Sequence, residues 1–468
     1  MTKLVTQDLR FDVNDKRVTV AGAARSGLAA AELLARRGAR VTLSDTRATV
    51  PEAEGLGSLG IALELGGHRL ETFVGADLVV LSPGVPSNQG VIEAARAKGV
   101  PVIAEIELAS RWLQGRLIAI TGTKGKSTTT ALTGRMLEAA GFRVLVGGNI
   151  GAPLSAQVSE STPDTVHVVE TSSFQLEQIA GFHPWIAVML NFSPDHLDRH
   201  PDVAAYGAAK ARIFENQDPG DWAVVNADDP AVLELARRGR AATRLFARQT
   251  PVAEGTVVES GWIVNRRRAG DERLVPLTAI HLLGSHLIGD VMAAATVGSI
   301  VGAAPSAMTA AVDAFHGLEH AMELVADVDG VRFVNDSKAT NVEAALRSIE
   351  SFERGLVPII GGRFKGGDVG VLREALRARA RAVVAIGEAR GLVRQALDGV
   401  VPVHEVGAFE TAVETAYELA KPGGVVLLAP ACASFDMFRD YAERGRKFKE
   451  EVARIARRAG TNDHRRDR

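Results

Sequence analysis

Residues 118–130, IAITGTKGKSTTT, combine residue types that can hold a nucleotide triphosphate. An apolar β-type run leads into a loop with two glycines, then a lysine, and then hydroxyl side chains that open a helical stretch. Backbone N–H groups of such a loop face phosphates, the lysine supplies positive charge, and a serine hydroxyl can bind Mg²⁺. The sequence therefore predicts an ATP site at Gly122, Thr123, Lys124, Gly125, Lys126, Ser127 and Thr128.

This loop departs from the general pattern G-x-x-x-x-G-K-[ST], because Ile120 stands where the first glycine belongs. A plain strand-to-helix turn of similar composition is therefore a competing interpretation. We favour nucleotide binding, because strand, glycines, lysine and hydroxyls occur in the order that the mechanism requires.

Two segments that follow expected strands offer metal ligands. The strand expected at 165–169 ends in Glu170, and a carboxylate beside a phosphate loop suits Mg²⁺. The strand expected at 185–190 is followed by NFSPDHLD, which carries His196. Zn²⁺ normally requires more His or Cys than this segment supplies, so we expect His196 to act near Mg²⁺ or phosphate. Satisfaction by local loop contacts is the alternative for this histidine.

Lys210 is a less obvious candidate on the helix that follows Pro201. It lies four residues after Tyr206 and four before Phe214, so the helical period predicts that it faces inward. Most lysines at such positions extend their charge to solvent. A desolvated lysine instead favours the neutral amine, which can react with CO₂ to give a carbamate anion near Mg²⁺.

The N-terminal block opens with VAGAARSG, and an acidic residue follows the next expected strand. This is close to a dinucleotide fingerprint, but Ala24 replaces the middle glycine and would hinder close approach of the backbone to a pyrophosphate. We therefore favour a mononucleotide or nucleotide-sugar crevice over an NAD site. Beyond the glycine loop, it would involve Ser82, Gly84, Asp45, Thr46 and Arg47.

The C-terminal block places polar loops after three expected strands, in NDSKATN, GGRFKG and APACASFD. The carboxyl ends of parallel strands are where ligands bind in open α/β sheets. Lys338, Lys365 and the Ser434 hydroxyl would suit a dicarboxylate. Cys432 has no activating partner nearby in sequence, so we expect it to be buried and unreactive.

Short β-branched runs alternate with helical stretches along the chain, which favours parallel sheets flanked by helices. A length of 468 residues suits about three domains. We expect an α/β protein with a Rossmann-like domain at 1–104, a central P-loop-type parallel-sheet ATPase domain at 105–315 and a Rossmann-like domain at 316–468. Residues 250–280 predict a small β excursion, and the charged tail 457–468 is expected to fray.

Composition argues against several other classes. With 54 basic and 56 acidic residues the charge is nearly balanced, so we expect no nucleic-acid partner. No apolar run reaches membrane-spanning length, which predicts no membrane partner. The single cysteine forms no internal disulfide and the first residues lack a signal peptide, so we expect a cytoplasmic location. We also expect a monomer.

Six motifs resemble the Mur ligase family in order and spacing over nearly the whole chain: TGTKGKSTTT, GGNIGAP, ETSSFQLE, NFSPDHLDRH, AYGAAKARIF and NDSKATN. The resemblance implies an ATP-dependent cytoplasmic enzyme that adds an amino acid to the peptidoglycan precursor. Within the family, NDSKATN and the SFDMF after PACA resemble the members that add D-glutamate to UDP-N-acetylmuramoyl-L-alanine. A substrate carboxylate would attack the γ-phosphate of ATP, and the amino acid would then displace phosphate from the acyl phosphate.

The resemblance also implies roles for individual residues. Lys126 would hold the phosphates, and Ser127 with Glu170 would bind one Mg²⁺. His196 and a carbamylated Lys210 would bind a second Mg²⁺. The residues implied at the UDP-sugar are Ser26, Asp45, Thr46, Arg47, Ser82, Gly84 and Asn149. Those implied around D-glutamate are Thr340, Lys365, Ser434, Phe435 and Tyr441.

The adenosine end of ATP has a less complete set of matching residues. Asp336 would contact the ribose. Leu287 stands where many members carry asparagine after the histidine of LLGSH, and Ala321 stands where a basic residue often follows GLEH. Either other residues hold the adenosine or ATP binds more weakly here.

Three alternatives remain open from the sequence. A ligase of the same fold would add L-glutamate or another amino acid, because a pocket built from loops does not reveal stereochemistry in sequence. An NAD-linked oxidoreductase would explain VAGAARSG and Asp45, but leaves the phosphate loop and Glu170 without a role. An ATP-binding regulator without useful turnover would explain Leu287 and Ala321.

Overall fold

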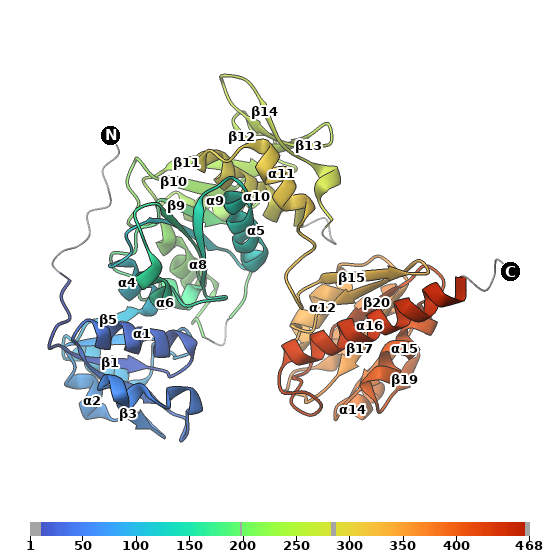
Figure 1. The fold of residues 1–468 in the computed structure, drawn as a ribbon, viewed down its shortest axis with the longest axis horizontal. Coiled ribbons are helices and arrows are strands. Elements are labelled where there is room, and N and C mark those ends of the chain that lie inside the picture. Colours follow the sequence, from blue (N-terminus) through green and yellow to red (C-terminus); the bar gives the residue numbers. More distant parts are fainter. Residues whose placement is uncertain (1–10, 197–198, 282–286, 464–468) are drawn as a thin grey trace. The chain divides into compact units, whose positions relative to one another are not determined.

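The computed structural model describes residues 11–196, 199–281 and 287–463. It divides into two compact units, one of Met1–Ile280 with Ile288–Ala314 and one of His281–Leu287 with Phe315–Arg468. The first unit contains two sheets and the second contains one (Figure 1). The α/β class expected from the sequence is confirmed, because helices alternate with mostly parallel strands in all three sheets.

The N-terminal sheet has five parallel strands in the order β3-β2-β1-β4-β5. Its strands are β1 Arg17–Ala21, β2 Arg40–Asp45, β3 Ala62–Leu65, β4 Leu78–Leu81 and β5 Val102–Ala104. Its helices are α1 Arg25–Arg36, α2 Leu70–Val74 and α3 Gly90–Ala97, with short 3₁₀ turns η1 Pro51–Ala53 and η2 Leu56–Leu59. The order reverses between β1 and β4, so the loops after these two strands border one crevice.

The central sheet has nine strands in the order β14-β13-β12-β11-β10-β9-β6-β8-β7. Its strands are β6 Arg116–Thr121, β7 Arg143–Gly148, β8 Thr165–Glu170, β9 Ile186–Met189, β10 Trp222–Asn226, β11 Ala242–Ala247, β12 Gly255–Glu259, β13 Trp262–Arg266 and β14 Glu272–Pro276. The pairs from β7 to β12 are parallel, whereas β12, β13 and β14 pair antiparallel and form the β excursion expected at 250–280.

Helices of several lengths accompany this sheet. They are α4 Glu105–Ser110, α5 Lys126–Ala139, α6 Leu154–Gln157, α7 Ser173–Leu176, α8 Val203–Ala211, α9 Pro230–Ala236, α10 Leu287–Val301 and α11 Pro305–Asp313, with 3₁₀ turns η3 Val158–Glu160, η4 Arg212–Phe214 and η5 Leu277–Ala279. Helix α4 follows β5 directly. Its buried residues belong to one continuous apolar core that includes residues of the N-terminal sheet and of the central sheet, so α4 connects the two sheets of this unit. Glu107 of α4 accepts hydrogen bonds from the backbone N–H groups of Ala180 and Phe182 at 2.9 and 2.7 Å.

The C-terminal sheet has six strands in the order β15-β16-β20-β17-β18-β19, and only the β15–β16 pair among them is antiparallel. Its strands are β15 Glu323–Val328, β16 Val331–Asn335, β17 Leu356–Gly361, β18 Val383–Ile386, β19 Val403–Glu405 and β20 Val425–Leu428. Its helices are α12 Val342–Glu350, α13 Arg373–Arg379, α14 Arg390–Ala396, α15 Phe409–Ala420 and α16 Tyr441–Asp463, with the 3₁₀ turn η6 Val369–Leu372.

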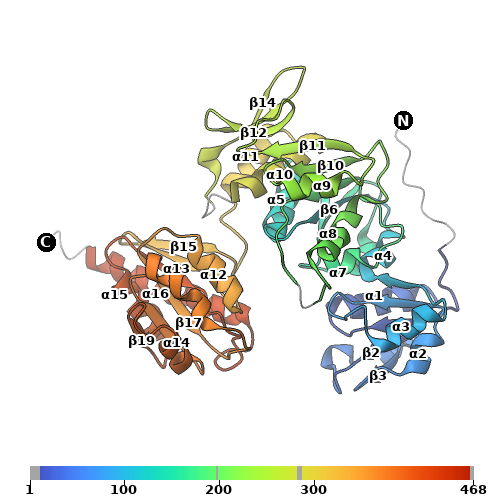
Figure 2. The same ribbon diagram turned by 180° about the vertical axis from the view of Figure 1, so that it is seen from behind.

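Two separate apolar clusters cover the two faces of this last sheet. Helices α12, α13 and α14 supply one cluster, and α15 with α16 supply the other (Figures 1 and 2). The expected fraying is wrong for residues 457–463, since α16 continues to Asp463, and residues 464–468 lie outside the described residues. Its apolar side, which includes Phe448, Val452 and Ile455, is buried and holds the helix on the sheet. Among the described residues, no helix is both long and apolar enough to cross a membrane.

Candidate active site

The phosphate loop, residues 122–125, joins β6 to α5 and requires glycine at both ends. Gly122 has a φ of 150° and Gly125 a φ of 80°. A methyl group on Gly122 would lie 3.0 Å from Leu190 Cβ, and one on Gly125 would lie 2.1 Å from Asp290 Oδ1. The two glycines, three residues apart, therefore belong to a tightly packed loop. At both positions the backbone angle and the close neighbouring atoms disfavour a residue with a side chain.

Two lysines converge on the first carbonyl of this loop. The Lys126 ammonium donates to Gly122 O and to Thr123 O, each at 2.9 Å. The Lys210 ammonium donates to Gly122 O at 2.8 Å and is buried, which is the inward position that the helical period predicts. Burial and, secondarily, the charge of Lys126 hold the pKa of Lys210 well below its usual value, which favours the neutral amine.

The expected Mg²⁺ ligands of the phosphate loop lie together. Strand pairing sets Ile120 of β6 opposite Glu170 of β8, so the carboxylate reaches the start of α5. Ser127 Oγ donates to Glu170 Oε2 at 2.7 Å, and Asn149 Nδ2 donates to Glu170 Oε1 at 2.8 Å. A hydroxyl and a buried carboxylate are the hard oxygen donors that Mg²⁺ prefers, so this pair fits the ion.

The histidines after β9 have different surroundings. His196 is about half exposed at its side chain, has a φ of 54°, and packs edge-on against Phe174 with ring centroids 5.0 Å apart. His200 is buried between Glu177 and Ser173, with its two ring nitrogens each 3.0 Å from their side chains. His200 is therefore held by local contacts, whereas His196 keeps exposed surface for a ligand.

In the N-terminal crevice, Asp45 fixes both its own strand end and the glycine loop. Its carboxylate accepts Ala23 N–H at 2.6 Å and Arg47 N–H at 2.8 Å, and it pairs with the Arg47 guanidinium at 3.0 Å. These contacts, the Arg47 side chain first among them, lower the pKa of Asp45 to about 2. The carboxylate is therefore charged and occupied by the protein, so its role includes shaping the crevice.

The remaining residues expected at the UDP-sugar border the same strand ends. Ser82 Oγ, after β4, donates to Gly22 O at 2.8 Å and so connects the two loops at the reversal of strand order. Thr46 and Gly84 are exposed and Ser26 is half-buried. Asn149, expected at the muramoyl part, hydrogen-bonds Glu170 in the central domain.

Three loops of the C-terminal domain meet at the ends of β16, β17 and β20. Ala431 N–H donates to Ala339 O at 2.9 Å, Gly361 N–H donates to Pro430 O at 2.8 Å, and Arg363 exchanges two backbone hydrogen bonds with Ala433. The three motifs NDSKATN, GGRFKG and APACASFD therefore lie against one another at one end of the sheet, as their positions after parallel strands indicate.

The residues expected around D-glutamate all lie on these loops or on the start of α16. Lys365 Nζ donates to Thr340 Oγ1 at 3.3 Å, and Ser434 is buried. Phe435 and Tyr441 are 63% and 41% exposed, a high exposure for aromatic rings that suits contact with a ligand. Cys432 is buried as expected, and burial raises the pKa of its thiol to about 11.

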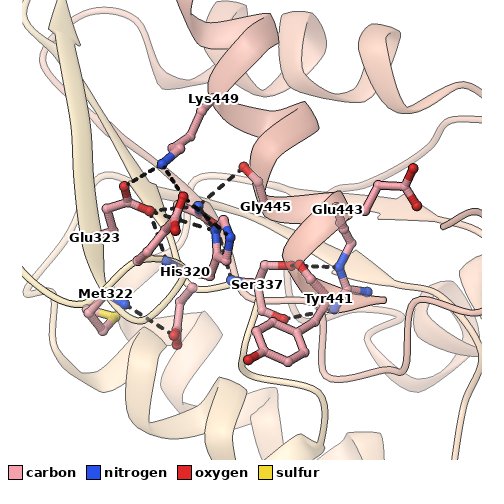
Figure 3. Close-up of polar contacts among 12 residues, drawn as sticks. His320, Met322, Glu323, Ser337, Tyr441, Glu443, Gly445 and Lys449 are labelled. Atoms are coloured by element: carbon pink, nitrogen blue, oxygen red, sulfur yellow. Dashed lines mark hydrogen bonds and ion pairs between the residues drawn. The ribbon is translucent and has the colours of Figure 1, made fainter. Parts of the chain in front are cut away.

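A polar network connects the NDSKATN loop to the start of α16 (Figure 3). Ser337 Oγ donates to Tyr441 O at 2.7 Å, which fixes the start of α16 to the NDSKATN loop. The Arg444 side chain, 1% exposed, donates to Ser337 O at 2.9 Å and to Cys432 O at 3.2 Å. Burial lowers the pKa of Arg444 to about 10.

Asp336, expected at the ATP ribose, is buried and makes contacts within its own domain. One carboxylate oxygen accepts Met322 N–H at 3.2 Å, and the other accepts the Ser348 hydroxyl. Ala321 lies beside Met322 in a short turn, and Leu287 is the buried first residue of α10. The LLGSH motif itself, residues 282–286, lies outside the described residues.

Sequence reasoning missed three residues that shape these sites. Asn191 hydrogen-bonds the phosphate loop, buried Asp290 lies against Gly125, and Arg444 connects two loops of the C-terminal domain. Asn191 stands at a strand end, which is a signal that could have drawn attention to it. Asp290 and Arg444 lie within helical stretches and carry no comparable signal.

Comparison with known proteins identifies the family of this chain. Three family models match the chain: Mur ligase MurD-like, N-terminal domain at residues 16–104, Mur ligase middle domain at 120–298, and Mur ligase, glutamate ligase domain at 320–432. The chain belongs to the Mur ligase family. This membership accounts for the phosphate loop and argues against the NAD-linked oxidoreductase that VAGAARSG left open.

Similar proteins span nearly the full length. UDP-N-acetylmuramoylalanine–D-glutamate ligase of Koribacter versatilis is 45% identical over 95% of this chain and 99% of its own. The enzyme of the same name from Geotalea uraniireducens is 44% identical over 94% and 98%. Among solved structures, UDP-N-acetylmuramate-alanine ligase of Thermotoga maritima shares the fold, at a TM-score of 0.57 and 18% identity, over 94% of this chain and 99% of its own.

Proposed function

We propose that this protein is an ATP-dependent ligase that joins the alanyl carboxylate of UDP-N-acetylmuramoyl-L-alanine to the amino group of D-glutamate. ADP and phosphate are the other products. One observation supports it above the others: full-length relatives at 45 and 44% identity are named for this reaction. In this chain, Lys126 and Ser127 open α5, and the Ser127 hydroxyl donates to Glu170, which supports a site for phosphate and Mg²⁺ at this helix start.

The phosphate loop is the part of the chain that positions ATP. The start of α5 presents backbone N–H groups and the positive end of the helix dipole to the phosphates. Lys126 supplies a positive charge that is fixed to the loop, because its ammonium donates to two loop carbonyls. Phosphoryl transfer depends mainly on such positioning and charge neutralisation.

Mg²⁺ would be held by Ser127 and Glu170 in the first site, and by His196 with carbamylated Lys210 in the second. When bound, the ions neutralise charge on the phosphate oxygens. Glu170 is kept in place for this role by the Asn149 amide. Carbamylation of Lys210 would form a bond from Nζ to the carbon of CO₂ and release one proton, and the buried neutral amine favours that reaction.

The UDP-sugar and the amino acid would bind to the loops of the N-terminal sheet and of the C-terminal sheet. The crevice at the reversal of strand order would take the uridine nucleotide through Ser26, Asp45, Thr46, Arg47, Ser82 and Gly84. The C-terminal loops would take D-glutamate, with Lys365 and the Ser434 hydroxyl opposite its carboxylates and with Thr340, Phe435 and Tyr441 around it. Asp336 would contact the ATP ribose. We also propose domain bounds at 1–104, 105–315 and 316–468, a monomer, and a cytoplasmic location.

A phosphate-release assay tests the reaction and the acceptor together. Purified protein would be given ATP, Mg²⁺ and UDP-N-acetylmuramoyl-L-alanine, with D-glutamate, L-glutamate, meso-diaminopimelate or lysine offered separately. We expect release that requires both the UDP-sugar and D-glutamate. A preference for L-glutamate would retain the ligase and correct the acceptor. Release that depends on no amino acid would contradict the ligase assignment.

A further inference from the structure

We propose that Asn191 is a positioning residue that holds the phosphate loop in the shape that binds ATP. The inference rests on the proposed function, because it concerns the same ATP site. Asn191 Oδ1 accepts the backbone N–H of Lys124 at 2.8 Å and that of Thr123 at 3.1 Å. Its amide nitrogen, Nδ2, donates to Lys124 O at 3.1 Å. The side chain thereby satisfies both backbone groups of Lys124, as a neighbouring strand would.

The loop needs such support because of its own sequence. It contains neither helix nor strand between β6 and α5, and it has a glycine at each end with positive φ. Glycine has more backbone freedom than any other residue, so the folded shape of this loop must be selected by contacts from outside. Three hydrogen bonds from the Asn191 side chain contribute to that selection, together with the bond from Thr123 N–H to the Asn191 backbone carbonyl and the bond from Lys210 to Gly122 O.

Asn191 is itself fixed by the strand end that carries it. Leu190 N–H donates to Thr121 O at 3.1 Å, and Asn226 Nδ2 donates to Leu190 O at 2.8 Å. On the other side of Asn191, Thr123 Oγ1 donates to Ser193 O and accepts Ser193 N–H, both at 3.1 Å. The segment 190–193 is therefore held by the sheet at Leu190 and is joined to the loop a second time through Ser193.

This arrangement directs the N–H groups and the carbonyl groups of the loop to different partners. The N–H groups of Thr123 and Lys124 are directed to Asn191, so the N–H groups at the start of α5 are left to face the phosphates. The carbonyls of Gly122 and Thr123 turn the other way and hold the Lys126 ammonium. Loss of Asn191 would let these carbonyls rotate toward the anion, which they repel.

The test compares Asn191→Ala and Asn191→Asp with Asn226→Ala. Asn226 donates to Leu190 O rather than to the loop, so Asn226→Ala loosens the strand end but keeps the bonds from Asn191 to the loop, and it should raise the KM for ATP less than either Asn191 variant does. The aspartate variant keeps the shape and the acceptor, but it places a negative oxygen against Lys124 O. For both Asn191 variants we expect the KM for ATP to rise at least about tenfold, because alanine removes all three side-chain hydrogen bonds and aspartate replaces the bond to Lys124 O by repulsion. The KM values for UDP-N-acetylmuramoyl-L-alanine and D-glutamate should change less than about twofold.

Calorimetric titration with ADP and Mg²⁺ separates this inference from the proposed function. If the wild-type protein binds ADP and both Asn191 variants bind it equally well, the positioning role is overturned while the ligase assignment stands. If Asn226→Ala raises the KM for ATP as much as Asn191→Ala, the effect is general loosening, and the inference is also overturned. If the wild-type protein binds no adenine nucleotide, the ATP site itself is wrong and the inference fails with it. Thermal unfolding of each variant checks that the fold is retained.

Discussion

Lys126 and Lys210 donate to the same acceptor, the carbonyl oxygen of Gly122, at 2.9 and 2.8 Å. Lys126 opens α5 and Lys210 lies in α8, so the shared carbonyl connects two helices through the phosphate loop. Two ammonium groups this close repel each other, and that repulsion adds to burial in lowering the pKa of Lys210. The residue proposed to carry the carbamate is thus electrostatically connected to the residue proposed to hold the phosphates.

Replacement of Lys210 by alanine should cripple the ligase. We expect kcat to fall at least about a hundredfold, as for other losses of electrostatic stabilisation in an active site. Short carboxylic acids should restore part of the rate, because they can place a carboxylate where the carbamate would lie, whereas bicarbonate should not. Rate measurements with added acetate or formate check this, and Lys126→Ala serves as the variant that these acids do not rescue. A fully active Lys210→Ala protein would show that this lysine is merely buried.

Alanine at Gly125 should disable the loop, whereas alanine at Gly141 should not. Both glycines have similar positive φ, 80° and 88°, but a methyl group on Gly125 meets Asp290 and one on Gly141 meets no atom within 4 Å. Backbone strain should cost each variant about 1 kcal/mol of stability. Loss of ATP-dependent turnover is expected for Gly125→Ala alone. Equal activities of the two variants would mean that the contact with Asp290 does not matter.

The stability of the protein should depend on pH through Glu105. This side chain is fully buried and one of its carboxylate oxygens accepts Ser155 N–H at 2.6 Å. Burial raises its pKa from the ordinary 4.5 to about 7, so the folded state favours the protonated form. The stabilisation is therefore complete below about pH 4.5 and is lost as the pH rises through 7, to a total on the order of 3 kcal/mol.

The Glu105→Gln variant provides the comparison, because glutamine stays uncharged at every pH. Urea unfolding of both proteins at pH 5 and pH 9 should show that the free energy of unfolding falls more between these pH values for the wild-type protein than for the variant. Parallel loss in the two proteins would assign the pH dependence to other groups.

Lys365 should determine the affinity for the amino acid. Its ammonium lies 3.3 Å from Thr340 Oγ1 on the loops proposed to hold D-glutamate. For Lys365→Gln we expect the KM for D-glutamate to rise at least about tenfold, since a charge-assisted contact to a carboxylate is lost. The KM for ATP should stay unchanged. Lys421→Gln, which removes a surface lysine paired with Glu418 in the same domain, is the control. An unchanged KM for D-glutamate in the Lys365 variant would move the acceptor site elsewhere.

Features that depend on local order along the chain could be predicted from the residues alone. Strand, glycines, lysine and serine follow one another in the chain, so the phosphate loop could be read directly, and Glu170 is recognisable because it ends an apolar strand. The inward position of Lys210 follows from the helical period. The end of α16 was predicted wrongly, because the charge of the tail indicated fraying. A few apolar residues at helical spacing pack on the sheet, and the helix continues to Asp463.

The distant residues that support the site became visible in the folded chain. Asn191 reaches Thr123 across 68 residues of chain, and Arg444 reaches Ser337 across 107. Such contacts depend on which strands become neighbours in a sheet, and strand order is a non-local property that the residues near each motif do not encode. Local chemistry therefore identified the reacting groups, whereas the packing of remote segments supplied the residues that hold them in place.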